Sequence, residues 1–244
     1  MESTHNSDRR VERYRALRSD VKASHPSAGE NRIVRKGFTK LCIEGFPRSA
    51  NSFFARAMAL MNEPDYKRSH VAHHIHDVRN LELAVLAGVP GVGLIREPSA
   101  AIASAMIYLQ LPESILVNTY LKFYQRLGQF YGKILIVDFE DVIGDMNAVV
   151  SLINQSFDCD YALCGNVDVL RDKVFKEIKG TAREIHNDGD NISKVGMPSE
   201  ERKSRREELQ AVVEKHPKFS VCSELYEKAS EWTGVAVKQA WSKK

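Results

Sequence analysis

The sequence LCIEGFPRSANSFFARAMA, residues 41–59, decides the fold of this chain. Apolar, β-favouring residues over 40–44 predict a buried strand, Gly45 and Pro47 predict a tight turn over 45–51, and residues 52–61 read as a helix. The first turn of a helix has unpaired N–H groups and the positive end of the dipole, so this turn can bind an anion. An ordinary capped strand–turn–helix fits the same residues, and the choice depends on the rest of the chain.

The side chains of the turn narrow the class of anion. Arg48, Ser49, Asn51 and Ser52 can bond phosphate oxygens or cap the helix. A Walker A loop, G-x-x-x-x-G-K-[ST], needs a second Gly and a Lys before Ser or Thr. The sequence GFPRSANS has neither, so a nucleoside triphosphate is not the expected ligand.

Composition sets the broad class of the protein. The chain has 244 residues, of which 43% are hydrophobic, enough for one sizeable α/β domain. Its formal charge of +3 is too small to indicate nucleic-acid binding. The four cysteines form no C-x-x-C pair, and the N-terminus is polar, so we expect a cytoplasmic protein. No apolar run approaches the roughly 18 residues that a membrane span requires.

The order of the expected elements predicts the fold class. We expect residues 1–31 to form a polar, partly disordered arm with a short helix over 9–22, and residues 32–244 to form one domain. Further strands are expected over 91–96 and 133–139. Helices are expected over 78–88, 99–108, 112–131, 140–154, 168–179, 199–216 and 220–232, with a polar loop over 181–197. This order predicts an α/β fold of three layers: a mostly parallel central sheet flanked by helices, with a P-loop-like strand–loop–helix and a helical C-terminal region.

A second group of residues lies where the next expected strand ends. Arg96 ends that strand, and Glu97 and Pro98 open the following helix. Ser104 follows Arg96 by eight residues (96 to 104) and lies within that helix. Ligands of open α/β sheets bind at the carboxyl ends of strands, and a guanidinium with a nearby hydroxyl suits a phosphate. A structural ion pair at a turn is the alternative.

Together the two motifs resemble those of a known enzyme family. PRSANSF, residues 47–53, is similar to the 5′-phosphosulfate loop of sulfotransferases that use 3′-phosphoadenosine 5′-phosphosulfate (PAPS), Pro-Lys/Arg-Ser-Gly-Thr-Thr-Trp. LIREPSAAIAS, residues 94–104, is similar to their 3′-phosphate loop, and the two occur in the family's order. Ala50 replaces the family's Gly, Asn51 and Ser52 replace its two Thr, and Phe53 replaces its Trp.

This resemblance implies an activity and a set of site residues. The activity is transfer of a sulfuryl group from PAPS to a hydroxyl or amine of a small-molecule or glycan acceptor. No metal is implied, because PAPS is a pre-activated donor. Arg48 would also stabilise the leaving group, and Phe53 would stack on adenine. The implied cofactor-binding residues are Arg48, Ser49, Ala50, Asn51, Ser52, Phe53, Arg96 and Ser104.

The segment KRSHVAHHIHD, residues 67–77, holds half of the chain's eight histidines. Their spacing suggests a metal site, but no further ligand can be identified, so a general base is favoured. His74 lies 22 residues before Arg96 (74 to 96), where cytosolic members of the family place a catalytic His. His73 and His70 are the alternates, and other branches of the family use Glu.

The same sequence features are compatible with two other functions. A P-loop kinase-like enzyme would share the strand–loop–helix, and Asp138 at a strand end could then bind magnesium. A sulfotransferase-like fold could instead serve as a non-catalytic binding module.

In cytosolic members of the sulfotransferase family, a C-terminal stretch folds over the 3′-phosphate. Lys194-Val195-Gly196 and Arg202-Lys203 are candidates here, with solvated surface as the alternative. The sequence leaves the oligomeric state open.

Overall fold

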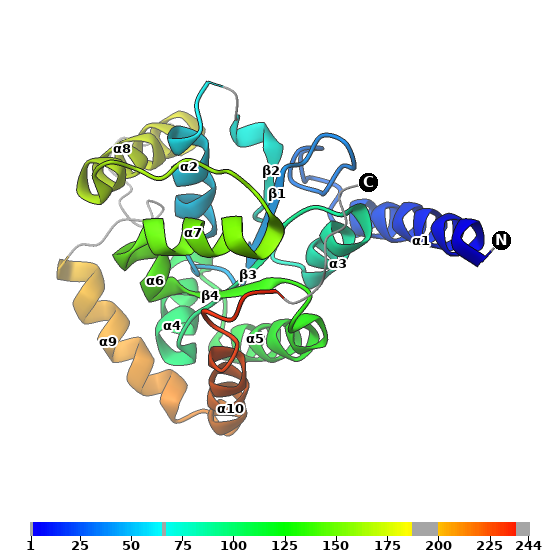
Figure 1. Ribbon diagram of the computed structural model, residues 1–244. Helices are drawn as coiled ribbons and strands as arrows, with labels where there is room; N and C mark the ends of the chain where they lie inside the picture. Colours follow the sequence, from blue (N-terminus) through cyan, green and yellow to red (C-terminus); the bar gives the residue numbers. More distant parts are fainter. Residues whose placement is uncertain (1, 65–66, 187–199, 238–244) are drawn as a thin grey trace.

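A computed structural model describes residues 2–64, 67–186 and 200–237 (Figure 1). In these residues the strands form one parallel sheet in the order β2-β1-β3-β4. The strands are β1 (Leu41–Gly45), β2 (Val71–His73), β3 (Gly91–Ile95) and β4 (Leu135–Asp138). The predicted α/β fold, with a parallel central sheet flanked by helices and a helical C-terminal region, is confirmed.

Helices make up most of the remaining described chain. They are α1 (Glu2–Ser24), α2 (Asn51–Met61), α3 (Val78–Ala87), α4 (Pro98–Leu109), α5 (Glu113–Leu127), α6 (Phe139–Gly144), α7 (Met146–Phe157), α8 (Val167–His186), α9 (Glu200–Glu214) and α10 (Phe219–Ser230). Two short 3₁₀ helices are η1 (Arg68–His70) and η2 (Gly128–Phe130). None of the helices in these residues combines the length and the apolar composition needed to cross a membrane.

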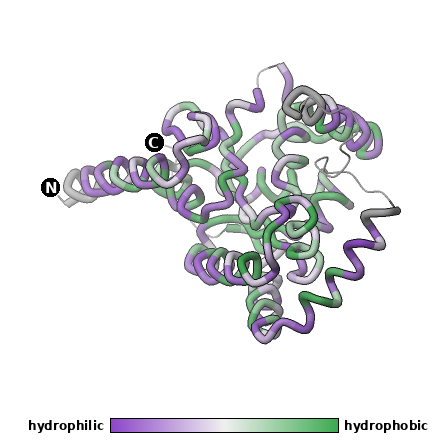
Figure 2. Tube along the Cα trace, turned by 180° about the vertical axis from the view of Figure 1, so that it is seen from behind, coloured by the Kyte–Doolittle hydropathy of each residue, from purple (hydrophilic) through white to green (hydrophobic). Residues whose placement is uncertain are grey.

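The sheet separates two apolar cores, which is why its strands are almost entirely hydrophobic. Successive side chains of a strand point to opposite faces, and β1 shows this directly. Leu41 and Ile43 belong to the core that includes α2, α7 and α8, whereas Cys42 belongs to the core that includes α3, α4, α5 and α10. Figure 2 shows the hydrophobic residues concentrated at the centre of the molecule.

Local sequence signals set several element boundaries as predicted. Gly88 ends α3 in the left-handed conformation, at φ 70°. Pro98 occupies the first turn of α4, and the Glu97 side chain caps that helix by accepting from the backbone N–H groups of Ser99 and Ala100. Gly45 is required at the end of β1, because a Cβ there would lie 2.8 Å from the Cβ of Leu94.

One strand was not predicted, and one expected helix is wrong. The unpredicted strand, β2, lies within the histidine-rich segment and pairs with β1. The helix expected over 140–154 is two helices, because Asp145 leaves the helical conformation at φ −139°. Its side chain then caps α7 by accepting from the N–H of Ala148.

The N-terminal arm is also different from the expectation of partial disorder. Residues 2–24 form one helix, α1, which extends from one side of the molecule beside α3 (Figure 1). Arg10 donates hydrogen bonds to the last carbonyls of α3, those of Val85 and Leu86, and the side chain of Val21 is fully buried. The charged residues that suggested disorder therefore cap a neighbouring helix end.

Candidate functional site

The loop after β1 has an unusual backbone. Arg48 and Ala50 are both in the left-handed region, at φ 73° and 66°, although neither is glycine. Ala50 is the N-cap of α2 and has no side-chain oxygen to offer. Ser49 is fully buried and Asn51 nearly so. Strained, buried polar loops at the start of a helix are typical of binding sites.

The structure brings the two sequence motifs into direct contact. Arg48 Nε donates to Ser104 Oγ of α4 at 3.2 Å, and its guanidinium lies over the ring of Tyr108 at 4.8 Å. Arg96 Nη1 donates to the backbone carbonyl of Arg48 at 2.6 Å. The carboxyl ends of β1 and β3, which are neighbours in the sheet, thus place both arginines in one cluster with Ser104.

Aromatic side chains fix Arg96 from two directions. Its backbone N–H donates to Tyr124 Oη at 2.8 Å, and its carbonyl accepts from Tyr120 Oη at 2.9 Å. The two tyrosine rings of α5 stack with centroids 4.1 Å apart. The guanidinium of Arg96 lies 3.9 Å from the ring centroid of Phe139. The aromatic stripe of α5 therefore positions a site residue in addition to filling the core.

Several buried polar atoms in this cluster have no hydrogen-bond partner among the described residues. They are Ser49 Oγ, Asn51 Oδ1, Arg96 Nε and Arg206 Nε. An unpaired buried polar group costs about 1–3 kcal/mol, so native structures rarely retain one without a reason. The hydroxyl and the guanidinium N–H groups are donors, and a bound anion would satisfy them.

Arg206 is a site residue that the sequence did not reveal. It lies on α9, which packs on α4 and donates a hydrogen bond from Gln210 Nε2 to Ser99 Oγ at 3.1 Å. Burial, together with the positive charges of Arg48 and Arg206, lowers the pKa of Arg96 to about 10. No feature of the run ERKSRREELQ distinguishes Arg206 from its charged neighbours.

The sequence candidates for a closing segment cannot be placed in this cluster. Lys194-Val195-Gly196 and the side chain of Arg202 lie outside the described residues. Lys203 is exposed.

Phe53 does not lie at the site as expected. Its ring is buried between α2 and α8, with its centroid 5.5 Å from that of Phe175. It fills the core on that face of the sheet, so it is not placed to stack on an adenine. Arg48, Ser49 and Ala50 lie in the turn as predicted, Ser52 lies in the helix as predicted, and Asn51 begins that helix one residue earlier than expected.

The histidines have different surroundings, and His74 lies beside the start of α2. His74 Nδ1 lies 3.3 Å from Ser52 Oγ in the first turn of α2. His73 is buried and its Nδ1–H donates to the carbonyl of Val71, while His70 packs edge-on against Phe38. Burial lowers the pKa of His74 to about 2 and that of His73 to about 4, so both rings are neutral at pH 7.

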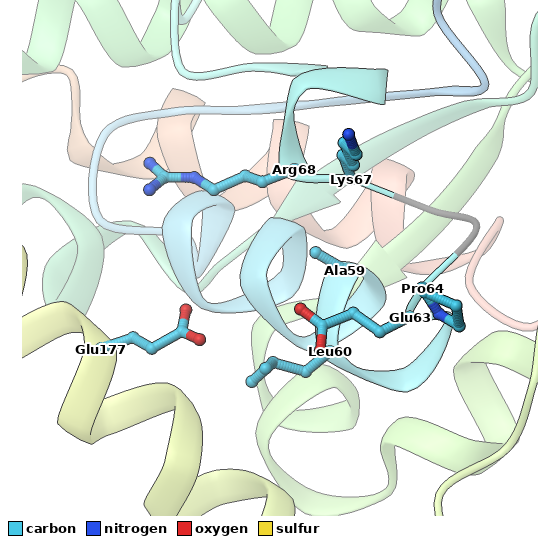
Figure 3. Close-up of a pocket in the computed structure, with 7 residues that line it drawn as sticks. All are labelled: Ala59, Leu60, Glu63, Pro64, Lys67, Arg68 and Glu177. Atoms are coloured by element: carbon cyan, nitrogen blue, oxygen red, sulfur yellow. The ribbon is translucent and has the colours of Figure 1, made fainter.

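A separate cavity of about 430 Å³ lies at the other end of α2 (Figure 3). Arg68 lies on one side of α2, and Glu177 reaches toward the helix from α8 on the other. The cavity is lined by Ala59, Leu60, Glu63, Pro64, Lys67, Arg68 and Glu177. Its two cations and two carboxylates cancel in formal charge, so it is a poorer match for a strongly anionic ligand than the arginine cluster.

Comparison of the chain with models of known protein families and with curated proteins gave no match in either case. Within the described residues, no three His, Cys, Asp or Glu side chains are grouped so that they could hold a metal ion. The interpretation of the site therefore rests on its own geometry and on the two motifs.

Proposed function

We propose that this chain is a PAPS-dependent sulfotransferase that moves a sulfuryl group to a hydroxyl or amine of a small-molecule or glycan acceptor. One observation carries the proposal: Arg48, Ser104 and Arg96 meet at the carboxyl ends of two adjacent parallel strands, beside buried donors that have no partner. This is where an open α/β sheet binds its ligand.

The residues present fit a ligand with phosphate at both ends. The N–H groups at the start of α2, Ser49 and Arg48 would hold the 5′-phosphosulfate, as the resemblance implies. Arg96 and Ser104 would hold the 3′-phosphate, and Arg206 adds a third cation beside Arg96. Arginine stays charged at neutral pH and offers several donors in one plane, so this cluster suits oxyanions.

His74 is placed by geometry to act as general base, but its lowered pKa makes it a weak base in the chain alone, so this role requires the negative charge of bound PAPS to raise that pKa. Its Nδ1–H would donate to Ser52 Oγ, which leaves Nε2 to take the proton of the acceptor. In the proposed step the bond between acceptor oxygen or nitrogen and sulfur forms, the bond between sulfur and the 5′-phosphate oxygen breaks, and the proton passes to Nε2. Arg48 would stabilise the negative charge that develops on the leaving phosphate.

A kinase-like reaction is less well supported by the same geometry. Asp138, the candidate magnesium ligand, is engaged at both oxygens. Its Oδ1 accepts from the N–H of Glu140 at 2.9 Å, and its Oδ2 accepts from Tyr226 Oη at 2.8 Å. The loop also lacks the Walker A lysine.

The proposal is tested by calorimetric binding of the product 3′-phosphoadenosine 5′-phosphate (PAP), with ATP as the comparison ligand. A hydrogen bond to a charged group contributes about 1.5–3 kcal/mol, so Arg96→Ala should weaken PAP binding by about 10- to 100-fold. Arg206→Gln on α9 tests the same site without emptying a core position. Arg126→Ala on the exposed face of α5 is the control and should change the affinity less than twofold.

Absence of PAP binding to the wild type, or equal affinity for ATP, would overturn the proposal. PAP binding without any PAPS turnover, with water or with a panel of hydroxyl and amine acceptors, would favour the non-catalytic binding module.

A further inference from the structure

Glu44 is a fully buried carboxyl group at the end of β1, directly before the loop. Its oxygens accept hydrogen bonds from the backbone N–H of His76 at 2.8 Å, from Asn80 Nδ2 at 2.9 Å and from the backbone N–H of Ile75 at 3.4 Å. A buried carboxyl group is costly, and two of the three donors to this one belong to the segment that precedes α3, while the third, Asn80, lies on α3. It therefore ties that segment, residues 74–77, to the end of β1.

The tethered segment has a backbone that needs support. His74 and His76 are both left-handed, at φ 69° and 54°, which costs about 1–2 kcal/mol for each residue that is not glycine. A second bond joins the segment to the loop, since His76 Nδ1–H donates to the carbonyl of Gly45 at 2.8 Å. Asn80 is itself fixed, because its Oδ1 accepts from the N–H of Val34 at 2.9 Å.

This strained turn carries His74, the histidine beside the first turn of α2. His74 sits with its Nδ1 3.3 Å from Ser52 Oγ and its ring 4.8 Å, centroid to centroid, from that of His76. The backbone of the next two residues is held by the carboxyl oxygens of Glu44. Displacing those oxygens would free the turn to relax and would move the His74 ring away from Ser52.

We propose that Glu44 is a positioning residue, which holds the His74 ring against Ser52 through the backbone N–H groups of Ile75 and His76. The significance for catalysis rests on the proposed function, in which His74 is the base. The positioning itself does not depend on the reaction.

The groups around Glu44 determine its pKa and therefore the pH at which it ionises. Burial and the negative charge of Asp77 raise its pKa to about 8, and the three N–H donors oppose that shift. The thiol of Cys42, on the same strand, is buried beside it and stays protonated. Ionisation above pH 8 would strengthen the two bonds to the turn and the bond to Asn80. The side-chain amide of a glutamine at this position would instead direct an N–H group at one or more of these N–H donors.

The direct test follows the His74 imidazole by NMR while the pH is varied, in the wild type and in Glu44→Gln. In the wild type the ring should stay neutral down to about pH 4, because it is buried. In Glu44→Gln we expect its pKa to rise by more than one unit toward 6.5. Glu82→Gln, a partly buried glutamate on α3 outside the site, is the matched control and should leave the His74 signals unchanged.

Activity gives the second measurement. PAP affinity should stay within about threefold in Glu44→Gln, because the hydrogen bonds from Arg48 to Ser104 and from Arg96 to the carbonyl of Arg48 do not involve Glu44 or the residues it holds. The rate of PAPS turnover should fall at least tenfold. Glu44→Asp, which keeps the carboxyl group but withdraws its oxygens by one methylene, should give an intermediate His74 shift and provides the test if Glu44→Gln does not fold.

An unchanged His74 titration in Glu44→Gln, or in Glu44→Asp where only that variant folds, would overturn the positioning role. Failure of the wild type to bind PAP would overturn the sulfotransferase proposal alone, since the NMR experiment needs no ligand. A His74 shift without a fall in PAPS turnover would show that Glu44 positions a residue that is not the base, which overturns the catalytic part of the inference.

Discussion

We expect the free energy of unfolding to be greatest near pH 7 and to fall on both sides, because three histidines, one buried and two partly buried, and one buried glutamate are held in neutral form. Burial lowers the pKa of His74 to about 2 and those of His73 and His76 to about 4, from 6.5. It raises the pKa of Glu44 from 4.5 to about 8. The two kinds of shift act in opposite pH directions.

The sign and size follow from proton linkage. The folded histidines bind protons less readily than the unfolded ones, so their stabilising effect is complete above about pH 6.5 and is lost as the pH falls toward the folded values. Folded Glu44 binds its proton more tightly, so its stabilising effect is complete below about pH 4.5 and is lost as the pH rises through about 8. One pKa unit corresponds to about 1.4 kcal/mol.

These values give a measurable asymmetry. Between pH 7 and 5.5 the three histidines together lose about 4 kcal/mol and Glu44 returns about 2, which leaves a net loss of about 2 kcal/mol. Between pH 7 and 9 Glu44 loses about 1.4 kcal/mol, while the unfolded histidines, about a quarter protonated at pH 7, return about 0.5 kcal/mol, which leaves a net loss of about 1 kcal/mol.

Urea unfolding at pH 5.5, 7 and 9 measures the effect, in the wild type, in Glu44→Gln and in the control Glu82→Gln. Glu44→Gln should lose the decline between pH 7 and 9 and should show a steeper acid decline, of about 4 kcal/mol instead of 2. The reasoning is refuted if the wild type and Glu44→Gln decline equally between pH 7 and 9, since Glu44 would then ionise alike in folded and unfolded chains.

Two further substitutions test the loop and its support. Ala50→Gly should stabilise the fold by about 0.5–1 kcal/mol, because a φ of 66° is unfavourable for alanine but carries no steric cost for glycine. A lower melting temperature in this variant would mean that the methyl group of Ala50 makes contacts that outweigh the backbone strain. Tyr124→Phe removes the hydroxyl that accepts from the backbone N–H of Arg96. It should lower the free energy of unfolding, measured in urea, by about 2 kcal/mol and weaken PAP binding several-fold. If neither value changes, the role assigned to this hydroxyl is contradicted.

The parts of the fold that could be predicted from the sequence are those encoded by neighbouring residues. The strand, turn and helix over residues 40–61, the end of α3 at Gly88 and the start of α4 at Pro98 each depend on local conformational preference, and each lies where it was predicted. The contact between Arg48 and Ser104 could also have been predicted from the sequence, because neighbouring parallel strands bring their carboxyl ends to the same edge of the sheet.

The parts that could not be predicted depend on contacts between distant segments. Strand β2 forms among histidines because β1 offers it a partner. Arg206 reaches the site because α9 packs on α4, and nothing within its charged run signals this. In the sequence Glu44 is indistinguishable from an ordinary strand residue, because the turn that its oxygens hold is formed by a distant segment.

The site's cost to the fold and its capacity to bind an anion have the same origin. The positive charges of Arg48 and Arg206 each repel that of Arg96. Arg96 donates one hydrogen bond to the carbonyl of Arg48, and its Nε has no hydrogen-bond partner among the described residues. Repulsion and unpaired donors destabilise the chain alone, and both are relieved when an oxyanion lies between these groups. Tyr120 and Tyr124 prevent the alternative, in which Arg96 would move outward to water, because they hold its backbone from both sides. The fold therefore holds the arginines together although this destabilises the chain alone, and a bound oxyanion would offset that cost.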